Sequence, residues 1–509
     1  MRALGAVVCC VLALACKHTE WEARFHAPEE HIPEEMPFLK VHTHRGHVHV
    51  LRSWRVEREQ ERIVGMGLHY DADRRLLDRG RQQVPLPDVV LLETNRPHKA
   101  VQAGAPVLGV MGVASAGVSF FCAGAPKACF GSCPTFYAET GEGPALLAEG
   151  FSRSIAKVLE STDVDSLHGA RGQDGRFDLE MRNEALETHF VRSAEVLAVP
   201  ADGPVMRAGD RFYEVRAPTP PGRCRADEGD CTDVLAALDG RAYAPPSDPE
   251  DLAAGEEVHL RFPARKGRTA LVLAGRNSLV QTFLFYGFIA RLGADAGRWL
   301  SALEREGPAV LERVLALEER IAKIRIDVRE SDGSWRHVGD YEEVGPIATD
   351  VQLVPLPERA SDGPLEVRLR LTRGYWKLDW VNRVALGEPV PAVTLEPRAV
   401  VGADGHLAPE EALAALRDRD RHLMTLPGER YVIRYAPPEG PHTLFLRSRG
   451  YYYEWQRKEW LEEENPVAAM RFIADPAGEL KRLAPAYKEI EHEAERLFWS
   501  SRVGPGGGR

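Results

Sequence analysis

Hydrophobic and polar residues alternate one by one over many short stretches of the chain. A period of two places successive side chains on opposite faces of an extended strand, so the pattern predicts a protein built mainly of β-strands. The alternation is clearest on both sides of Arg45-Gly46, two residues that can form a tight turn between residues 38–44 and 47–53. Together with two further alternating stretches, it predicts a small antiparallel β domain at residues 37–97.

A second β-rich segment, residues 128–276, carries cysteine-containing loops between its strands. The period then changes to that of a helix, since apolar residues after Ser278 recur at Leu279, Phe283, Tyr286 and Ile289. This spacing marks one face of a helix and predicts a helical insert at residues 277–322. Residues 399–503 are expected to mix strands with helices, and the glycine-rich residues 504–509 are expected to form a disordered tail.

Residues 323–398 hold the most regular succession of short strands and turns, which is typical of a β-sandwich. The order Trp335, Gly345-Pro346-Ile347 and Leu365-Glu366-Val367-Arg368-Leu369 resembles galactose-binding-like jelly rolls. This resemblance implies a module that binds sugar or another surface ligand. The candidates for stacking on a sugar ring are Trp335, Tyr375, Trp376 and Trp380. The alternative is a packing role, because aromatic residues in strands often belong to the core.

Taken together, the segments predict a multi-domain α+β fold that is rich in antiparallel strands. The chain of 509 residues is long enough for several domains with cores of their own. One of these is expected to be a β-sandwich in the C-terminal half, and the helices are expected to form separate segments.

The first sixteen residues have the architecture of a signal peptide. Arg2 is followed by an uncharged, mostly apolar run that ends at Ala15 and is too short for an ordinary membrane span. The ending Ala13-Leu14-Ala15-Cys16 resembles the lipobox of bacterial lipoproteins, in which the signal is removed and the new N-terminal cysteine carries lipid. The resemblance implies removal of residues 1–15, lipidation of Cys16 and a location in the cell envelope. By resemblance to the sorting of proteobacterial lipoproteins, Lys17 after the cysteine implies the outer membrane. The acidic residues of 17–36 predict a spacer between lipid and fold.

Residues 98–127 form an apolar segment rich in glycine and alanine. Residues 106–125 are uncharged and long enough to span a bilayer, but small residues outnumber the large apolar ones. A lipid at Cys16 and a membrane span here would place the rest of the chain inside the cell. We therefore favour a buried or membrane-apposed segment over a spanning helix.

The cysteines fit an oxidising compartment. Once Cys9 and Cys10 leave with the signal, the residues close enough in sequence to form local disulfides are Cys129 with Cys133 and Cys224 with Cys231. Cys122 then remains as a free thiol. A four-cysteine zinc site is the alternative, although its spacing is wider than is usual for zinc. The stretch around Cys129 and Cys133 also resembles stretches in uncharacterised bacterial lipoproteins, a resemblance that brings no known activity.

The hairpin at Arg45-Gly46 suggests a candidate metal site. A two-residue turn would place His44 opposite His47 and His42 opposite His49, so that four imidazoles share one face of the hairpin. Neutral imidazoles are suitable ligands for zinc, copper or nickel. The alternative is a solvated hairpin face, and a shift of one residue in the register would disperse the four side chains.

Charge and motifs limit the functional classes. The net charge is −11 without a basic block, which argues against nucleic acid as a partner. The chain contains none of the short motifs G-x-S-x-G, H-E-x-x-H, Walker A or G-x-G-x-x-G. The sequence thus favours a non-catalytic lipoprotein of the cell envelope that binds a carbohydrate or an envelope protein, or serves as a scaffold. The alternative is a metal-dependent envelope enzyme that uses His42, His44, His47 and His49.

Overall fold

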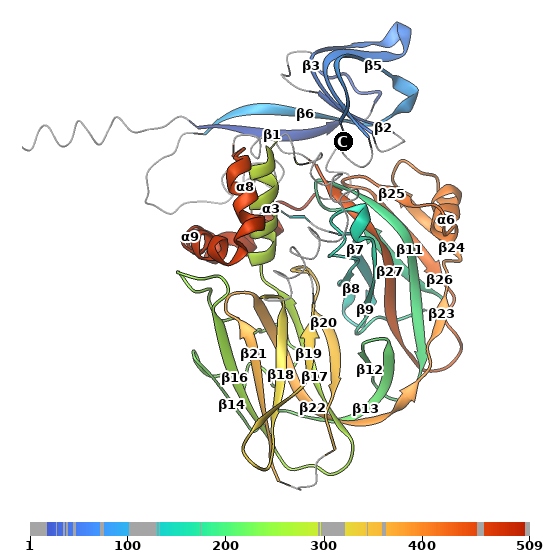
Figure 1. Ribbon diagram of the computed structural model, residues 1–509. Coiled ribbons are helices and arrows are strands. Elements are labelled where there is room, and N and C mark those ends of the chain that lie inside the picture. The colour runs from blue at the N-terminus through green and yellow to red at the C-terminus, as the bar shows by residue number, and fades with distance from the viewer. Residues whose placement is uncertain are drawn as a thin grey trace, which may run out of the picture.

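The computed structural model describes residues 18–26, 28–33, 36, 39–43, 47–71, 76–100, 130–131, 133–173, 175–293, 296, 321–343, 345–358, 363–455 and 463–503. It is 49% strand and 17% helix, with five sheets and four helices in these residues (Figure 1). The predicted richness in antiparallel strands is confirmed. The α+β class describes the chain only loosely, because strands far outweigh helices in the described residues.

The N-terminal sheet has six antiparallel strands. In spatial order they are β1 (His18–His26), β6 (Val89–Ala100), β2 (Leu39–Thr43), β3 (Val48–Glu57), β4 (Arg62–Tyr70) and β5 (Leu76–Pro85). Short 3-10 turns, η1 (Arg58–Gln60) and η2 (Leu86–Asp88), follow β3 and β5. The core of the sheet gathers Leu39, Val41, Leu51, Trp54 and Ile63.

Strand β1 falls within the predicted acidic spacer. Its residues pair with β6 along their whole length, from His18 opposite Ala100 to His26 opposite Leu92. The sequence of this stretch alternates apolar and charged residues, since Trp21, Ala23 and Phe25 are separated by charged residues. The many acidic residues favoured the spacer interpretation instead. A period of two over nine residues is a strand signal, so the expectation of a spacer was wrong for residues 18–26.

Two five-stranded sheets pack face to face into a first sandwich. One sheet has the order β24 (Ala399–Asp404), β26 (Arg430–Tyr435), β10 (Phe177–Arg182), β7 (Thr135–Thr140) and β8 (Gly143–Glu149). The other has the order β23 (Val393–Leu395), β11 (Glu187–Pro200), β27 (His442–Glu454) and β9 (Ser161–Ser166), with β25 (Leu423–Thr425) also on β11. The shared core includes Phe136, Leu179, Val196, Ile433 and Leu446.

The second sandwich joins a closed barrel to a six-stranded sheet. The barrel consists of β12 (Val205–Ala208), β13 (Arg211–Thr219), β22 (Trp376–Val390), β17 (Thr269–Asn277) and β20 (Asp350–Pro355). The sheet, called here the distal sheet, has the order β15 (Gly229–Asp230), β14 (Arg223–Ala226), β16 (Gly255–Phe262), β21 (Leu365–Thr372), β18 (Lys323–Arg329) and β19 (Trp335–Glu342). In Figure 1 it lies at the end of the molecule opposite the N-terminal sheet.

Residues 323–398 therefore form only part of a sandwich. Strand β21 pairs with β16 on one side and with β18 on the other, so the distal sheet draws strands from both sides of the helical region. Strands β20 and β22 likewise close on β17 in the barrel. Pairings over such distances in sequence leave no local signal, which is why the sequence pattern placed the boundary too late.

Four helices of the described residues pack against the two sandwiches. They are α3 (Val280–Leu292), α6 (Pro409–Arg417), α8 (Pro466–Ala474) and α9 (Pro476–Ser500). Helix α9 contributes Leu483 and Tyr487 to the core of the second sandwich and Leu497 and Phe498 to that of the first. One helix thus joins both cores, and Pro485 lies inside it without ending it.

Several predicted segments lie outside the described residues. These are the signal at 1–16, most of the apolar segment 98–127, most of the helical insert beyond α3, and the tail at 504–509. Within the described part of the chain, no helix combines the length and the apolar character that crossing a bilayer requires.

Candidate functional site

The candidate site lies on the solvent-facing side of the distal sheet. Side chains alternate strictly in β16 and β21, so that Val258, Leu260, Val367 and Leu369 enter the core. The residues between them point outward, and the register aligns them across strands, with His259 opposite Arg368 and Arg368 opposite Asp327. We call this side of the sheet the outward face.

A single carboxylate lies at the centre of the outward face. The Asp327 side chain is only 2% exposed, although it is on the solvent side of the sheet. Its Oδ2 atom is 2.8 Å from Arg368 Nη2 and 3.0 Å from Arg370 Nε, and its Oδ1 atom is 3.3 Å from Arg325 Nε. Burial opposes the charge, but hydrogen bonds from Arg368 and Arg325 and the charge of Arg370 lower the pKa of Asp327 below its ordinary value. Three guanidinium groups therefore share one ionised partner.

Aromatic and imidazole side chains lie beside this cluster. The Trp335 ring is half-buried, with the Arg368 guanidinium carbon 4.7 Å and the His259 ring 5.9 Å from its centre. His337, which lies opposite Asp327 on the neighbouring strand β19, has its Nδ1 atom 3.6 Å from Asp327 Oδ1. The surroundings of Asp327 thus combine cations, imidazoles and one indole ring in a small area.

An open groove of about 870 Å³ runs across this face. Its cationic or titratable basic lining residues are Arg225, His259, Lys323, Arg325 and Arg370. Its carboxylates are Asp227, Glu256, Glu257 and Asp340. Small-molecule pockets are usually lined mainly by apolar side chains, whereas this groove is mainly polar, so its surface suits a hydrophilic ligand.

The outward face is more basic than the chain as a whole. On the paired strand positions of this face, Lys and Arg occupy eight positions: Arg223, Arg225, Arg261, Lys323, Arg325, Arg329, Arg368 and Arg370. Asp and Glu occupy six: Asp230, Glu257, Asp327, Asp340, Glu342 and Glu366. The outward face thus carries an excess of positive charge, whereas the chain as a whole has a net charge of −11.

Only part of the predicted aromatic site lies here. Tyr375 and Trp376 are 0% and 1% exposed and belong to the core of the second sandwich, so their assignment to a ligand site was wrong. Trp380 is half-buried and lines a separate hollow of about 320 Å³ near Pro218 and Ala236. Trp335 alone is on the outward face. The sequence analysis did not identify the arginines around Asp327 as candidates. The alternation Glu366-Val367-Arg368-Leu369-Arg370 nevertheless predicts a strand with one charged face.

The four-histidine face of the N-terminal hairpin does not form. The Thr43 amide donates to His47 O at 3.0 Å, so His47 pairs with Thr43 and not with His44. The register moves by one, which places His42 opposite Val48 and Val41 opposite His49. His42 is therefore on the other side of the sheet from His47 and His49, and the predicted metal set is wrong; His44 lies outside the described residues.

His42 instead connects the N-terminal sheet to the first sandwich. Its ring stacks on Trp455 with the centres 3.7 Å apart, and Trp455 Nε1 donates to Thr188 Oγ1 at 2.9 Å. Glu93 of β6 lies on the same face of the N-terminal sheet as His42, and its Oε2 atom is 3.5 Å from His42 Nε2. The histidine therefore has a packing role at an interface.

The other two described histidines of the hairpin, His47 and His49, contact His69 of β4. His47 Nδ1 is 2.9 Å from His69 Nε2, and the His49 and His69 rings stack 3.9 Å apart. Burial, together with the charge of His69, lowers the pKa of His49 to about 4, so its ring is neutral near pH 7. In the described parts of the chain, no group of three or more His, Cys, Asp or Glu residues is arranged to hold a metal.

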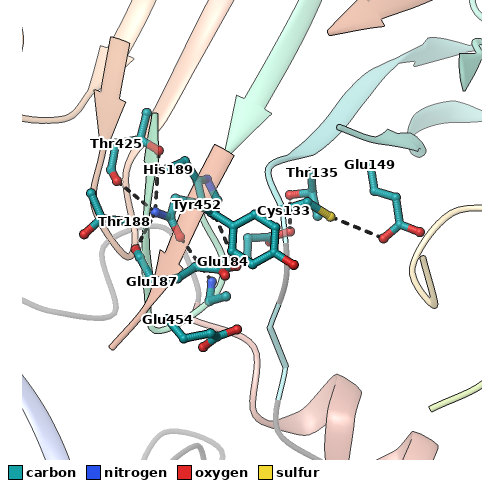
Figure 2. A network of polar contacts seen from close by, with 12 residues as sticks. Cys133, Thr135, Glu149, Glu184, Glu187, Thr188, His189, Thr425, Tyr452 and Glu454 are labelled. Carbon is teal, nitrogen blue, oxygen red and sulfur yellow. Dashed lines mark hydrogen bonds and ion pairs between the residues drawn. The ribbon is translucent and has the colours of Figure 1, made fainter. Parts of the chain in front are cut away.

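A buried polar network lies inside the first sandwich. Figure 2 shows Cys133 and Glu149 at one end, and Glu187, His189 and Glu454 at the other. Glu149 Oε1 accepts from the Ile347 amide at 3.2 Å, while its Oε2 is 3.5 Å from Cys133 Sγ. Burial raises the pKa of Glu149 to about 8, so this acid is mostly protonated at neutral pH.

The histidine of the network is also neutral. His189 is fully buried, and burial lowers its pKa to about 3. The Nε2 atom of His189 is 3.2 Å from Glu187 Oε1. A neutral imidazole and a protonated thiol in a closed core differ from the activated cysteine–histidine pairs of nucleophilic enzymes. The network therefore fits a structural role.

Cys133 should resist alkylation in the folded protein. It is a free, buried thiol, so the predicted disulfide with Cys129 is wrong for Cys133; Cys129 and Cys122 lie outside the described residues. Burial raises the pKa of Cys133 well above its ordinary value. Because the thiolate is the reactive form, we expect maleimide labelling at pH 8 to be at least about 100-fold slower than in denaturant. Pulse labelling and peptide mass measurement test this, and rapid labelling of the native protein would contradict the burial.

The second predicted disulfide is confirmed. Cys224 and Cys231 are bonded, with their Cα atoms 5.0 Å apart, and both are buried in the core below the distal sheet. The bond closes the short turn between β14 and β15. The alternative of a zinc site that uses these two cysteines is thereby excluded.

Comparison with protein-family models gives no match, and comparison with curated proteins gives none either. Among solved structures, the VP2 protein of infectious bursal disease virus aligns over 94% of this chain and 92% of its own, at 7% identity and a TM-score of 0.15. The arabinofuranosyltransferase AftD from Mycobacteria aligns over 86% of this chain and 31% of its own, at 11% identity and a TM-score of 0.15. An α-xylosidase from Xanthomonas citri aligns over 85% of this chain and 34% of its own, at 9% identity and a TM-score of 0.13. Similarity at this level carries no argument about the fold or the function of the present chain.

Proposed function

We propose that this chain is a lipid-anchored protein of the bacterial cell envelope, at the outer membrane, that binds a carbohydrate without catalysing a reaction. The single observation that carries the binding role is the open, polar groove on the outward face of the distal sheet. Its side chains come from neighbouring paired strands, so the ligand-facing surface is rigid and already formed.

The proposed compartment is supported by two features far apart in the sequence. The first sixteen residues resemble a lipoprotein signal that ends at Cys16. Much later in the chain, Cys224 and Cys231 form a buried disulfide, a bond that persists mainly in oxidising compartments. A tether at Cys16 would leave the distal sheet, which lies at the opposite end from the N-terminal sheet, directed away from the membrane (Figure 1).

Thiol labelling of an Arg325→Cys variant tests the orientation of the groove in intact cells. The Arg325 side chain is 50% exposed, so a cysteine at this position should be accessible to a small hydrophilic maleimide that does not cross the cytoplasmic membrane. We expect labelling of the variant before lysis, above the background of the wild-type chain. Labelling that appears only after lysis would place the groove inside the cell and overturn the proposed function.

A further inference from the structure

We infer that the ligand of the groove is an acidic polysaccharide, and that Arg325 and Arg370 bind its carboxylate groups. This inference rests on the proposed function and names the class of carbohydrate. It starts from the charge balance around Asp327, where one buried carboxylate faces three guanidinium groups.

Two of the three arginines, Arg325 and Arg370, keep binding capacity beyond Asp327. A guanidinium group has five N–H donors in a fixed plane, and the contacts to Asp327 use only some of them. Glu257 Oε1, 3.1 Å from Arg368 Nη1, is the second carboxylate near the cluster. Arg368 contacts both acids, whereas the Arg325 and Arg370 side chains are 50% and 40% exposed and line the groove. A carboxylate of the ligand would meet donors that Asp327 already holds in place.

Acidic side chains in the same groove favour a sugar over other anionic polymers. Asp227, Glu257 and Asp340 line the groove together with the cations. The phosphodiester backbone of DNA has no hydroxyl group, so it offers these carboxylates no hydrogen-bond donor. Sugar hydroxyl groups, in contrast, donate hydrogen bonds to carboxylates. A polymer that carries both hydroxyl and carboxyl groups matches both signs of charge in the lining.

Trp335 adds an apolar surface at the side of the cluster. It lies next to His259, which lines the groove, and Arg368 approaches its ring. An indole ring beside charged hydrogen-bonding groups provides both contacts that a sugar ring needs, namely an apolar face and polar edges. The open shape of the groove suits a chain that continues beyond both ends of the bound segment.

Binding of the full-length protein in detergent to defined polysaccharides tests the inference. The probes are polygalacturonate, its methyl-esterified form and neutral dextran. We expect polygalacturonate to bind best, its affinity to fall with rising salt, and esterification to weaken binding at least about tenfold. The double variant Arg325→Gln/Arg370→Gln should lose about tenfold or more in affinity for polygalacturonate.

Two further variants control for folding. Arg225→Gln removes a cation that lines the groove without touching Asp327, and it should weaken binding in the same direction. Arg434→Gln removes an arginine paired with Asp178 in the first sandwich, and it should leave the affinity unchanged.

The outcomes separate the inference from the proposed function. Equal binding of dextran and polygalacturonate that depends on Trp335 would overturn the acidic ligand and leave the carbohydrate role in place. Tighter binding of a nucleic acid or of anionic lipid vesicles would overturn the acidic polysaccharide. If none of these polysaccharides bound at the groove, both proposals would fall.

Discussion

A Glu149→Gln variant should be more stable than the wild-type protein at pH 9 and similar to it at pH 5. Glu149 is 1% exposed, and burial raises its pKa from 4.5 to about 8. The folded state therefore holds a proton that the unfolded state releases between these two values. The stability that the neutral acid contributes is complete below pH 4.5 and is lost as the pH rises through 8.

The expected difference in the free energy of unfolding is large, because the pKa of Glu149 is raised in the folded state and ordinary in the unfolded state. A pKa that moves from 4.5 to about 8 corresponds to a loss on the order of 5 kcal/mol above pH 8. Glutamine copies the neutral acid: its oxygen can accept from the Ile347 amide, and its amide can face Cys133 Sγ. Urea unfolding at several pH values measures the effect as a difference in the free energy of unfolding between variant and wild type.

Glu388→Gln serves as the matched control, because the Glu388 side chain is 83% exposed. It should change the free energy of unfolding little at any pH. Asp165 and Glu343, whose pKa values are also raised by burial and by neighbouring carboxylates, should leave part of the pH dependence in the Glu149 variant. Equal pH profiles for Glu149→Gln and the wild-type protein would show that Glu149 is ionised in the folded state.

A Gly67→Ala variant should lose the pairing between β3 and β4. A Cβ atom at residue 67 would lie 2.0 Å from the Val50 carbonyl oxygen and 2.9 Å from the Leu51 Cα atom. Both are backbone atoms within the sheet, so they cannot move aside as the end of a long side chain would. We expect a local destabilisation of at least about 3 kcal/mol, at the upper end of overpacking effects.

Amide hydrogen exchange, read by peptide mass, measures this result. Peptides from β3 and β4 should lose protection, while those from β11 and β27 in the first sandwich should keep it. Gly203→Ala is the control, since a Cβ atom at that position meets nothing within 4 Å. Unchanged protection in β3 after the Gly67 substitution would mean that the two strands pair differently from the arrangement described here.

Local patterns predicted the strands well. The outward face of β21 could be foreseen from the alternation in Leu365–Thr372, because each second residue is apolar and buried. The disulfide between Cys224 and Cys231 followed from short spacing together with the expected oxidising compartment. In both cases the determining interactions lie within a few residues, where sequence contains the relevant information.

Register and long-range pairing could not be predicted in the same way. The register of the histidine hairpin differs from expectation by one residue, and this shift moves His42 from the predicted group to a stack on Trp455. His69, which joins His47 and His49, comes from a neighbouring strand and was invisible to a pattern within the hairpin. A period of two gives the two faces of a strand but does not say which residue of another strand lies opposite.

In the candidate site, too, local features were predicted and features that depend on strand pairing were not. Trp335 was foreseen because aromatic residues stand out in a sequence. The cluster around Asp327 was not foreseen, because its arginines come from β18 and β21 and meet only when the two strands pair. Burial separated Tyr375 and Trp376 from Trp335, although all three are aromatic residues in the same predicted segment.

The mass of the full-length protein purified from membranes tests the proposed attachment most directly. We predict a mature chain that begins at Cys16 and carries acyl groups on that residue. A chain that still begins at Met1, with Cys16 unmodified, would contradict the envelope location and with it the access of the groove to an extracytoplasmic polysaccharide.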